Sequence, residues 1–433
     1  MSGFRNFAGT VASAPHTRQS ISTLEQLAQA LDAAARHGHG VRTVGAGHSF
    51  TALCRTDQVL LDLDGFSGIE EVDAATHEVT FRAGTRLWQI PRLLKPFGLA
   101  LENMGDIDKQ SIAGAISTGT HGTGLDYTGF AGTVTGIQLM LADGTRLRTS
   151  RSEHPQIFEA ARLSLGALGV ITHVRLRSVP AYMMRAVESI EPVDQLVDSF
   201  LQRAAAEDHL EFFWFPNSPR AQVKTNTRLP GGAPRHAPGA AARWFNDELL
   251  SNGALQVLCS LGAAAPKLNS KLSNFASSVL SDRSYTASWH EAFASPRRVR
   301  FTEQEYALPL ENFQAAFEQL RGYLRGINLP VLFPIEVRTA KADDVWLSTA
   351  YGRDSVYIAV HRYIRDAAPH YFSDVEALLR PLGGRPHWGK EHSLGAADFA
   401  QLYPRFADFQ SVRSAVDPEG RFLNGYLRGL LGA

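Results

Sequence analysis

Cysteine is scarce in this chain, whose 433 residues include only Cys54 and Cys259. Two thiols cannot build a disulfide framework or a cysteine-ligated zinc site, and their scarcity fits a reducing compartment. No apolar run reaches the roughly 18 residues that a membrane-spanning helix needs. The first residues also lack the apolar core of a signal peptide. We therefore expect no membrane span and a cytoplasmic location.

An excess of charge of either sign is also missing. The 43 Lys and Arg balance the 43 Asp and Glu, whereas proteins that bind nucleic acid through charge usually carry a basic excess. This balance argues against nucleic acid as a partner, and no metal site is predicted. What the chain does have is apolar residues, 44% of the total. At about 150 residues per domain, its length predicts two or three globular domains.

The first 180 residues alternate helix and strand patterns. Apolar residues at helical spacing predict a helix over 22–37, with Ser22 or Thr23 as its N-cap. The Asp143-Gly144 turn predicts a β-hairpin over 133–149. The pattern indicates an α+β domain, since strict βαβ repetition is absent. Further predicted elements are strands at 41–44, 58–63, 78–82 and 170–179 and a helix at 87–97 that ends at Gly98.

After Pro180 the helical patterns become longer. The composition of residues 230–239 predicts an exposed loop, because they include three prolines and three glycines. The predicted elements here are helices at 191–207, 254–280 and 311–325 and strands at 211–215 and 356–363.

A glycine-rich segment, Val44-Gly-Ala-Gly-His-Ser-Phe50, follows the predicted strand 41–44. Its glycines allow positive φ and a close approach of the backbone to a ligand, which suits a phosphate-binding loop. Phe50 replaces the third glycine of a dinucleotide fingerprint, and Thr51 replaces the last glycine of the hydrolase motif Gly-x-Ser-x-Gly. The loop by itself leaves three alternatives: a phosphate site, a hydrolase, or an ordinary hydrogen-bonded His48.

A second segment, Ser111 to Gly124, is more informative. It contains four glycines, three threonines and two serines but no charged residue. This composition predicts a loop rather than a helix or strand, and its amide and hydroxyl donors could converge on a pyrophosphate. The alternative is a polar surface loop, but Ile112 and Ile116 tie the segment to a core. A third glycine-bearing turn, 165–171, leads into a strand.

Charged residues mark the second half of the chain. Glu336 and Arg338 stand two apart on a predicted strand, so their side chains share one face. His361 ends an apolar strand, and Lys390 follows a glycine loop. From these residues alone, the Glu336–Arg338 pair is either part of a site or an ion pair on a solvated sheet.

Taken together, these segments resemble the aldonolactone oxidoreductase branch of the vanillyl-alcohol-oxidase-type FAD flavoproteins. That branch contains the gulono-, galactono- and arabinono-lactone oxidases and dehydrogenases and the alditol oxidases. The resemblance covers nearly the whole chain, with all motifs in the same order. It rests on residues 45–50, 111–124, 165–169, 336–338, 387–390 and 417–424.

The resemblance implies an α+β, two-domain fold. Residues 1–180 would form the FAD-binding domain and 181–433 a cap or substrate domain, whose last segment, 385–433, returns to the flavin. His48 stands where family members attach the flavin, so we expect FAD to be bound covalently through His48. The residues expected to bind FAD are Gly45, Ala46, Gly47, His48, Ser49, Phe50, Gly105, Ser111, Gly114, Ser117, Thr118, Gly119, Thr120, His121, Gly122, Gly169, Val170 and Asn424.

The resemblance also implies that four residues face the substrate: Glu336, Arg338, Lys390 and His361. The expected reaction moves a hydride from the substrate to flavin N5 while the substrate hydroxyl loses a proton. Arg338 and Lys390 would stabilise the negative charge that develops. Glu336, His361 and Lys390 remain alternatives for the base.

The chain departs from alditol oxidases at two positions, with Asp106 in place of serine and Tyr363 in place of threonine. We therefore expect a sugar lactone as substrate, an aldono-1,4-lactone of the gulono or galactono type. Oxidation at its C2 hydroxyl would lead to an ascorbate-like product. An alditol or carbohydrate oxidase and a non-catalytic flavin-binding protein are the alternatives.

Gly105 matches the position that lies against the reactive edge of the flavin in relatives. Glycine there would leave room for oxygen, so O2 is an expected acceptor and H2O2 an expected product. Another electron acceptor is the alternative for the reaction. For Gly105 itself, the alternative is a turn with positive φ.

Overall fold

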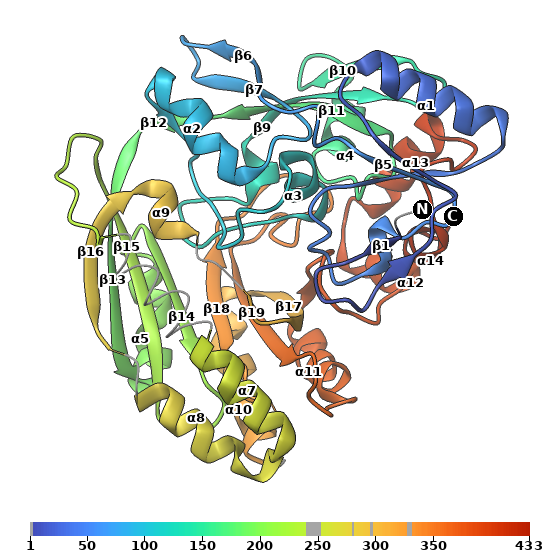
Figure 1. The fold of residues 1–433 in the computed structure, drawn as a ribbon. Helices are drawn as coiled ribbons and strands as arrows, with labels where there is room; N and C mark the ends of the chain where they lie inside the picture. Colours follow the sequence, from blue (N-terminus) through green and yellow to red (C-terminus); the bar gives the residue numbers. More distant parts are fainter. Residues whose placement is uncertain (1–2, 240–252, 279–280, 295–297, 327–330) are drawn as a thin grey trace.

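The computed structural model describes residues 3–239, 253–278, 281–294, 298–326 and 331–433. In Figure 1, one part comes from the first 180 residues and the last helices of the chain, and a second part is built on a large sheet whose strands lie between residues 182 and 386. This mixture of helices and sheets in two parts confirms the predicted α+β class. Among the described residues, no helix is long and apolar enough to cross a membrane.

The first part contains the helix, strands and hairpin that the sequence predicts. Helix α1 (Leu24–Arg36) begins at Thr23, whose side chain accepts a hydrogen bond from the N–H of Gln26, and it buries Leu27 and Leu31. Its parallel sheet is β3 (Thr17–Ser20), β5 (Val59–Asp62) and β4 (Val41–Val44). Its antiparallel sheet is β10 (Arg146–Ser150), β9 (Val134–Met140), β11 (Val170–Arg177), β7 (Glu78–Arg82) and β6 (Ile69–Asp73). Shorter elements are β1 (Phe4–Arg5), β2 (Ala12–Ser13), β8 (Leu99–Ala100), β12 (Val179–Pro180), α2 (Ile90–Leu94), α3 (Ile112–Thr118) and α4 (Pro155–Ala161).

The second part is an eight-stranded antiparallel sheet with helices on both faces. Because side chains alternate along a strand, Phe212 and Val337 pack against the helices of one face, while Phe213 and Glu336 point to the other face. The strand order is β16 (Arg283–Ser288), β13 (Tyr182–Pro192), β15 (Arg220–Pro230), β14 (His209–Trp214), β18 (Ile335–Ala340), β19 (Ser355–Tyr363), β17 (Phe301–Pro309) and β20 (Arg385–Pro386). The helices of this part are α5 (Val193–Ala204), α7 (Ala254–Ala264), α8 (Asn269–Ser278), α9 (Trp289–Phe293), α10 (Phe313–Gly326) and α11 (Tyr371–Leu379).

Three sequence predictions of local structure were wrong or incomplete. The segment after Ser111 is a helix, α3, because the Ser111 side chain accepts from the N–H of Gly114 and Ile112 and Ile116 are buried. The helix predicted over 254–280, of which 279–280 lie outside the described residues, is two helices, α7 and α8, separated at Pro266. The helix predicted over 87–97 is α2 flanked by two short 3-10 turns. The 230–239 segment is mostly exposed, as predicted.

The last helices pack against the first part of the chain rather than the large sheet. Phe399 and Leu427 share one apolar cluster with Leu27. The Asn424 side-chain amide donates to the carbonyl oxygens of Ala52 and Arg55, at 2.8 Å each. The C-terminus thus closes over the loop that follows His48. These helices are α12 (Ala396–Leu402), α13 (Phe406–Val416) and α14 (Gly425–Leu431).

One buried histidine joins the two parts. His209 of β14 lies with its Nδ1 2.7 Å from the carbonyl oxygen of Thr123, in the segment after α3. Its ring stacks on Tyr127, with centroids 4.6 Å apart. A carbonyl only accepts, so Nδ1 carries the hydrogen and donates. Burial lowers the pKa of His209 from its ordinary value to about 3.

We expect this histidine to destabilise the protein in mild acid. A depressed pKa means that the unfolded chain binds the proton first, so stability is fully present above about pH 6.5 and falls toward pH 3. Burial also lowers the pKa of His48 to about 4 and that of His387 to about 3. Both histidines therefore make the fall of stability with decreasing pH steeper. Unfolding temperatures measured from pH 7.5 to 4 should fall less steeply in His209→Asn, whose amide can still donate to Thr123. The exposed His37→Asn variant is the control, and an unchanged slope in His209→Asn would contradict the assignment.

Candidate active site

Two cavities meet to form one elongated space between the two parts. Both are lined by His48, Ser49, Gln110 and Thr118, which mark the junction. The first cavity runs along the three glycine-bearing segments of the first part. The predicted residues that line it are Gly45, Ala46, Gly47, His48, Ser49, Ser111, Gly114, Ser117, Thr118 and Gly169. The second lies under the large sheet and is lined by Phe50, Gly105, Thr120, His121, Glu336, Arg338, His361 and Lys390, also predicted.

Four predicted FAD-binding residues line neither cavity. Gly119 ends α3 in the left-handed conformation, with φ of 79°, and Gly122 accepts a hydrogen bond from His121 through its carbonyl. Val170 is buried at the start of β11, and Asn424 fastens the C-terminus. These four residues therefore lie outside the lining of both cavities.

The first cavity has the features that a flavin dinucleotide needs. A Cβ built on Gly45 would lie 2.5 Å from the Ser111 hydroxyl oxygen, so a side chain there would displace the hydroxyl that caps α3. Gly47 has φ of +68°, which also favours glycine. The loop presents main-chain N–H groups to the cavity, and Ser49, Ser111 and Ser117 line it with hydroxyls, a donor set that suits phosphate oxygens. The residues present therefore fit the expected cofactor.

Arg42, which also lines the first cavity, fixes the position of its glycine segments and was not predicted. Its buried guanidinium donates to the carbonyl oxygens of Leu53 at 2.9 Å, Leu165 at 2.8 Å and Gly166 at 2.8 Å. These bonds hold the third glycine-bearing segment against the first. Arginine carries several donors in a rigid fork, which suits this role.

The second cavity is roofed by one face of the large sheet. Glu336 of β18 and Glu305 of β17 are both in register with Ala359 of β19, which lies between them. The small side chain of Ala359 leaves room above the middle strand. Arg338 reaches across this space, and its Nη2 lies 2.7 Å from Glu305 Oε1 and 3.4 Å from Glu336 Oε2.

The buried Arg338–Glu305 ion pair shifts the pKa of each group in the direction that favours its charged form. Burial alone would raise the pKa of Glu305, but Arg338 and His121 hold it well below its ordinary value. Burial alone would likewise lower the pKa of Arg338, whereas Glu336 and Glu305 raise it well above its usual range. Both groups are therefore charged, and the guanidinium is fixed by its partner.

Glu303 forms a second such pair two residues earlier on β17. Its carboxylate contacts the ammonium of Lys390, and its Oε1 lies 3.5 Å from Nε2 of His361, its register partner on β19. Burial alone would raise the pKa of Glu303, but Lys390 and His361 lower it to about 2. The Lys390 ammonium also lies 5.5 Å from the centre of the Phe50 ring, a cation–π contact.

His48 stands at the junction of the two cavities. Its ring stacks on Phe7 with centroids 4.8 Å apart, which fixes the plane of the imidazole. Burial, followed by the nearby Lys390, lowers the pKa of His48 to about 4. The imidazole is therefore neutral at physiological pH and keeps a nucleophilic nitrogen.

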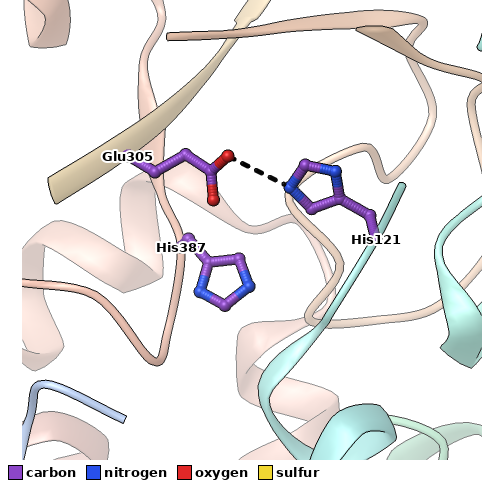
Figure 2. Close-up of side chains that lie close together, drawn as sticks. All are labelled: His121, Glu305 and His387. Atoms are coloured by element: carbon purple, nitrogen blue, oxygen red, sulfur yellow. Dashed lines mark ion pairs between the residues drawn. The ribbon is translucent and has the colours of Figure 1, made fainter. Parts of the chain in front are cut away.

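Figure 2 shows the side chains of His121, Glu305 and His387, which lie close together beside the second cavity. Their potential ligand atoms lie within 4.8 Å of one another, but each residue already has a hydrogen-bonding role. His121 Nδ1 donates to the carbonyl of Gly122, and His387 Nδ1 accepts from the N–H of Gly389. Glu305 binds Arg338, a cation that would repel a metal ion. We assign no metal to this cluster.

Sequence reasoning missed Glu303, Glu305 and His387. One signal was available: Glu303 and Glu305 stand two apart in an otherwise strand-like segment, the same spacing that singled out Glu336 and Arg338.

The two positions at which the sequence departs from alditol oxidases, Asp106 and Tyr363, differ in their location. Asp106 lines the second cavity. Tyr363 is buried outside it and accepts a hydrogen bond from the Gln256 side chain at 2.6 Å. Tyr363 therefore supports α7 instead of lining the cavity.

Comparison with known proteins assigns the family. Residues 174–430 match the family described as D-arabinono-1,4-lactone oxidase, and residues 20–150 match an FAD binding domain. The chain is 39% identical to an L-gulono-1,4-lactone dehydrogenase of Mycobacterium tuberculosis, over 99% of this chain and 98% of the relative. It is 31% identical to an L-gulonolactone oxidase of Scyliorhinus torazame, with 98% and 97% covered. It is also 31% identical to an alditol oxidase of Streptomyces, with 98% of each covered.

Solved structures give the same fold at much lower identity. A cholesterol oxidase from Brevibacterium sterolicum superposes with a TM-score of 0.82 at 17% identity, over 99% of this chain and 96% of that one. A chitooligosaccharide oxidase superposes with a TM-score of 0.72 at 14% identity, over 97% and 93%. Relatives that match end to end, together with a cavity that suits a flavin dinucleotide, agree with the resemblance seen in the motifs. The chain belongs to the aldonolactone oxidoreductase branch of the vanillyl-alcohol-oxidase-type flavoproteins and is an FAD-dependent oxidoreductase that acts on CH–OH groups.

Proposed function

We propose that the substrate is an aldono-1,4-lactone of the gulono or galactono type and that its C2 hydroxyl is oxidised. The names of the relatives support a lactone. The observation that carries the proposal is the roof of the second cavity, where Arg338 and Lys390 are each fixed by a carboxylate beside Glu336. Such a set can bind several hydroxyls and stabilise a developing negative charge.

The flavin, when bound, supplies the hydride acceptor. Arg338 would stabilise the charge that develops on the substrate oxygen. His361 is poorly placed to take the proton, because Nδ1 is engaged by the carbonyl of Pro334 at 2.8 Å and Nε2 faces Glu303. The Lys390 ammonium is engaged by Glu303 as well. We therefore assign proton uptake from the substrate hydroxyl to the Glu336 carboxylate, a role typically worth roughly 10²–10⁴ in rate.

We propose that FAD is attached covalently through His48. A neutral imidazole held at the junction of the two cavities supports this, because the flavin ring would follow the nucleotide past that point. The 45–50 loop has two nucleophilic side chains, His48 and Ser49, and the imidazole is the stronger nucleophile of the two.

Oxygen is the proposed acceptor, with H2O2 as the product. The alternative of a positive-φ turn at Gly105 was wrong, because Gly105 is not among the glycines with positive φ. A Cβ built there would lie 2.8 Å from the carbonyl oxygen of His121, which is main chain and cannot simply move aside. An alanine at 105 would therefore shift His121 and disturb flavin reduction too. Oxygen use is best measured on the unaltered protein.

A screen for reduction of the bound flavin tests the proposed function. Under anaerobic conditions, gulono- and galactono-1,4-lactones should bleach the flavin faster than open-chain alditols do. Asp106, which lines the cavity where alditol oxidases carry serine, is the reason for this order. Admission of air should restore the colour and yield H2O2. Bleaching by alditols alone would favour the alditol oxidase alternative, and no bleaching by either class would favour a non-catalytic flavin protein.

A further inference from the structure

Two buried carboxylates on β17 each lie beside one cationic side chain and one histidine. Glu303 and Glu305 are each at most 4% exposed, and both line the second cavity. Residues two apart on a strand share a face, so both side chains lie under the sheet. Neither carboxylate takes part in the hydride or proton transfer proposed above, although burial of two charges about 6–7 Å apart along a strand is costly unless each is compensated.

Beside each carboxylate lie one cation, which forms an ion pair with it, and one imidazole. Glu305 binds Arg338 at 2.7 Å and lies 3.4 Å from Nε2 of His121. Glu303 binds Lys390 and lies 3.5 Å from Nε2 of His361.

Both imidazoles are anchored to the main chain on their other side. Nδ1 of His121 lies 2.8 Å from the carbonyl oxygen of Gly122, and Nδ1 of His361 lies 2.8 Å from that of Pro334. Each carboxylate thus lies between a ring fixed by the main chain and a long cationic side chain, which it binds. Groups locked in this way need little reorganisation during a reaction.

We propose that Glu303 and Glu305 are positioning residues that act separately, Glu305 through Arg338 and Glu303 through Lys390. Long cationic side chains lose much rotamer freedom when they are ordered. A buried carboxylate that fixes the cation before substrate arrives removes this cost from the reaction. The inference rests on the proposed function, because it assigns Arg338 and Lys390 to the reacting centre.

Double-mutant cycles test whether each carboxylate acts through its own cation. The single variants are Glu303→Gln, Glu305→Gln, Arg338→Leu and Lys390→Met. A matched pair combines a carboxylate variant with the variant of the cation that it binds, Glu305 with Arg338 or Glu303 with Lys390. A crossed pair combines it with the variant of the other cation. Each holoprotein is assayed for its limiting rate of anaerobic flavin reduction, its apparent affinity for the lactone and its unfolding temperature. Glu188→Gln is the control, because the buried Glu188 of β13 forms an ion pair with the exposed Arg283 at 2.6 Å and lines neither cavity.

We expect each Gln variant to lower the limiting rate roughly 10- to 100-fold, as the loss of a supporting partner typically does. In the matched pairs, adding the Gln change to the cation variant should lower the limiting rate little further. In the crossed pairs the two fold-decreases in the limiting rate should multiply. Glu188→Gln should lower the unfolding temperature and leave the limiting rate unchanged. If Glu305→Gln does not fold, Glu305→Asp, which keeps the charge on a shorter side chain, takes its place in the cycles.

Two results would overturn the inference. Losses that multiply in the matched pairs as fully as in the crossed pairs would mean that the carboxylates do not act through these cations. A weaker lactone affinity at an unchanged limiting rate would mean that they bind substrate directly. Failure of the proposed function is distinct, because the unaltered protein would then not be reduced by lactone at all. In that case non-additivity of the unfolding temperatures in the matched pairs still tests the pairing.

Discussion

The variant His48→Ala should release all of its FAD when the protein is precipitated with acid. In the unaltered protein the yellow colour and flavin fluorescence should stay with the denatured chain. The reason is that a covalent bond from the imidazole survives unfolding, whereas contacts with the glycine loops do not. The measurement is the distribution of flavin absorbance between pellet and supernatant. This change, from complete retention to complete loss, is the largest that we predict.

His392→Ala is a matched control for this experiment. His392 is also a histidine whose pKa is lowered by burial, to about 4, and its Nε2 lies 3.2 Å from the Tyr426 hydroxyl, away from both cavities. Its loss should leave the flavin in the pellet. An unaltered protein that releases all its flavin into the supernatant would refute the attachment through His48, although the non-covalent FAD site would stand.

The variant Arg338→Leu should slow reduction of the flavin by roughly 10²–10³, about 3–4 kcal/mol in the barrier, since one preorganised donor at a developing anion is typically worth this much. The FAD content should not change, because Arg338 lines the second cavity and not the first. The measurement is the rate of anaerobic bleaching at saturating lactone. The loss also leaves Glu305 as a buried carboxylate without its guanidinium, so the unfolding temperature should fall.

Arg353→Leu separates the two effects of losing Arg338. Arg353 donates to the carbonyl oxygens of Ala307 at 3.1 Å and Gly383 at 2.7 Å and lines neither cavity. Its loss should cost stability but not the rate of reduction. Arg338→Lys keeps a charge but loses the planar fork, so an intermediate rate is expected. A near-normal rate in Arg338→Leu would return the Glu336–Arg338 pair to a purely structural role.

Local patterns in the sequence were enough for much of the first part. Helix α1 and the strands that flank it follow from spacing and capping, because each depends on residues a few positions apart. The glycine-bearing segments were also found, since a close approach of backbone to ligand requires glycine. The prediction of a loop over 111–124 was confirmed for 119–124 but failed at 112–118. A helix forms there because Ser111 caps it and tertiary burial of Ile112 and Ile116 outweighs weak helix propensity.

The sequence by itself determined the chemistry of the glycine loops, the order of the motifs and therefore the flavoprotein family. It also placed Glu336 and Arg338 on one face of a strand. Only the tertiary structure decided what that face meets: Glu305 lies 33 residues from Arg338 along the chain, and His121 lies further away still. Strand order put the small Ala359 between β18 and β17, so that Arg338 reaches Glu305 across it. Spacing along a chain cannot reveal such partners, because sheet register joins residues that no local pattern relates.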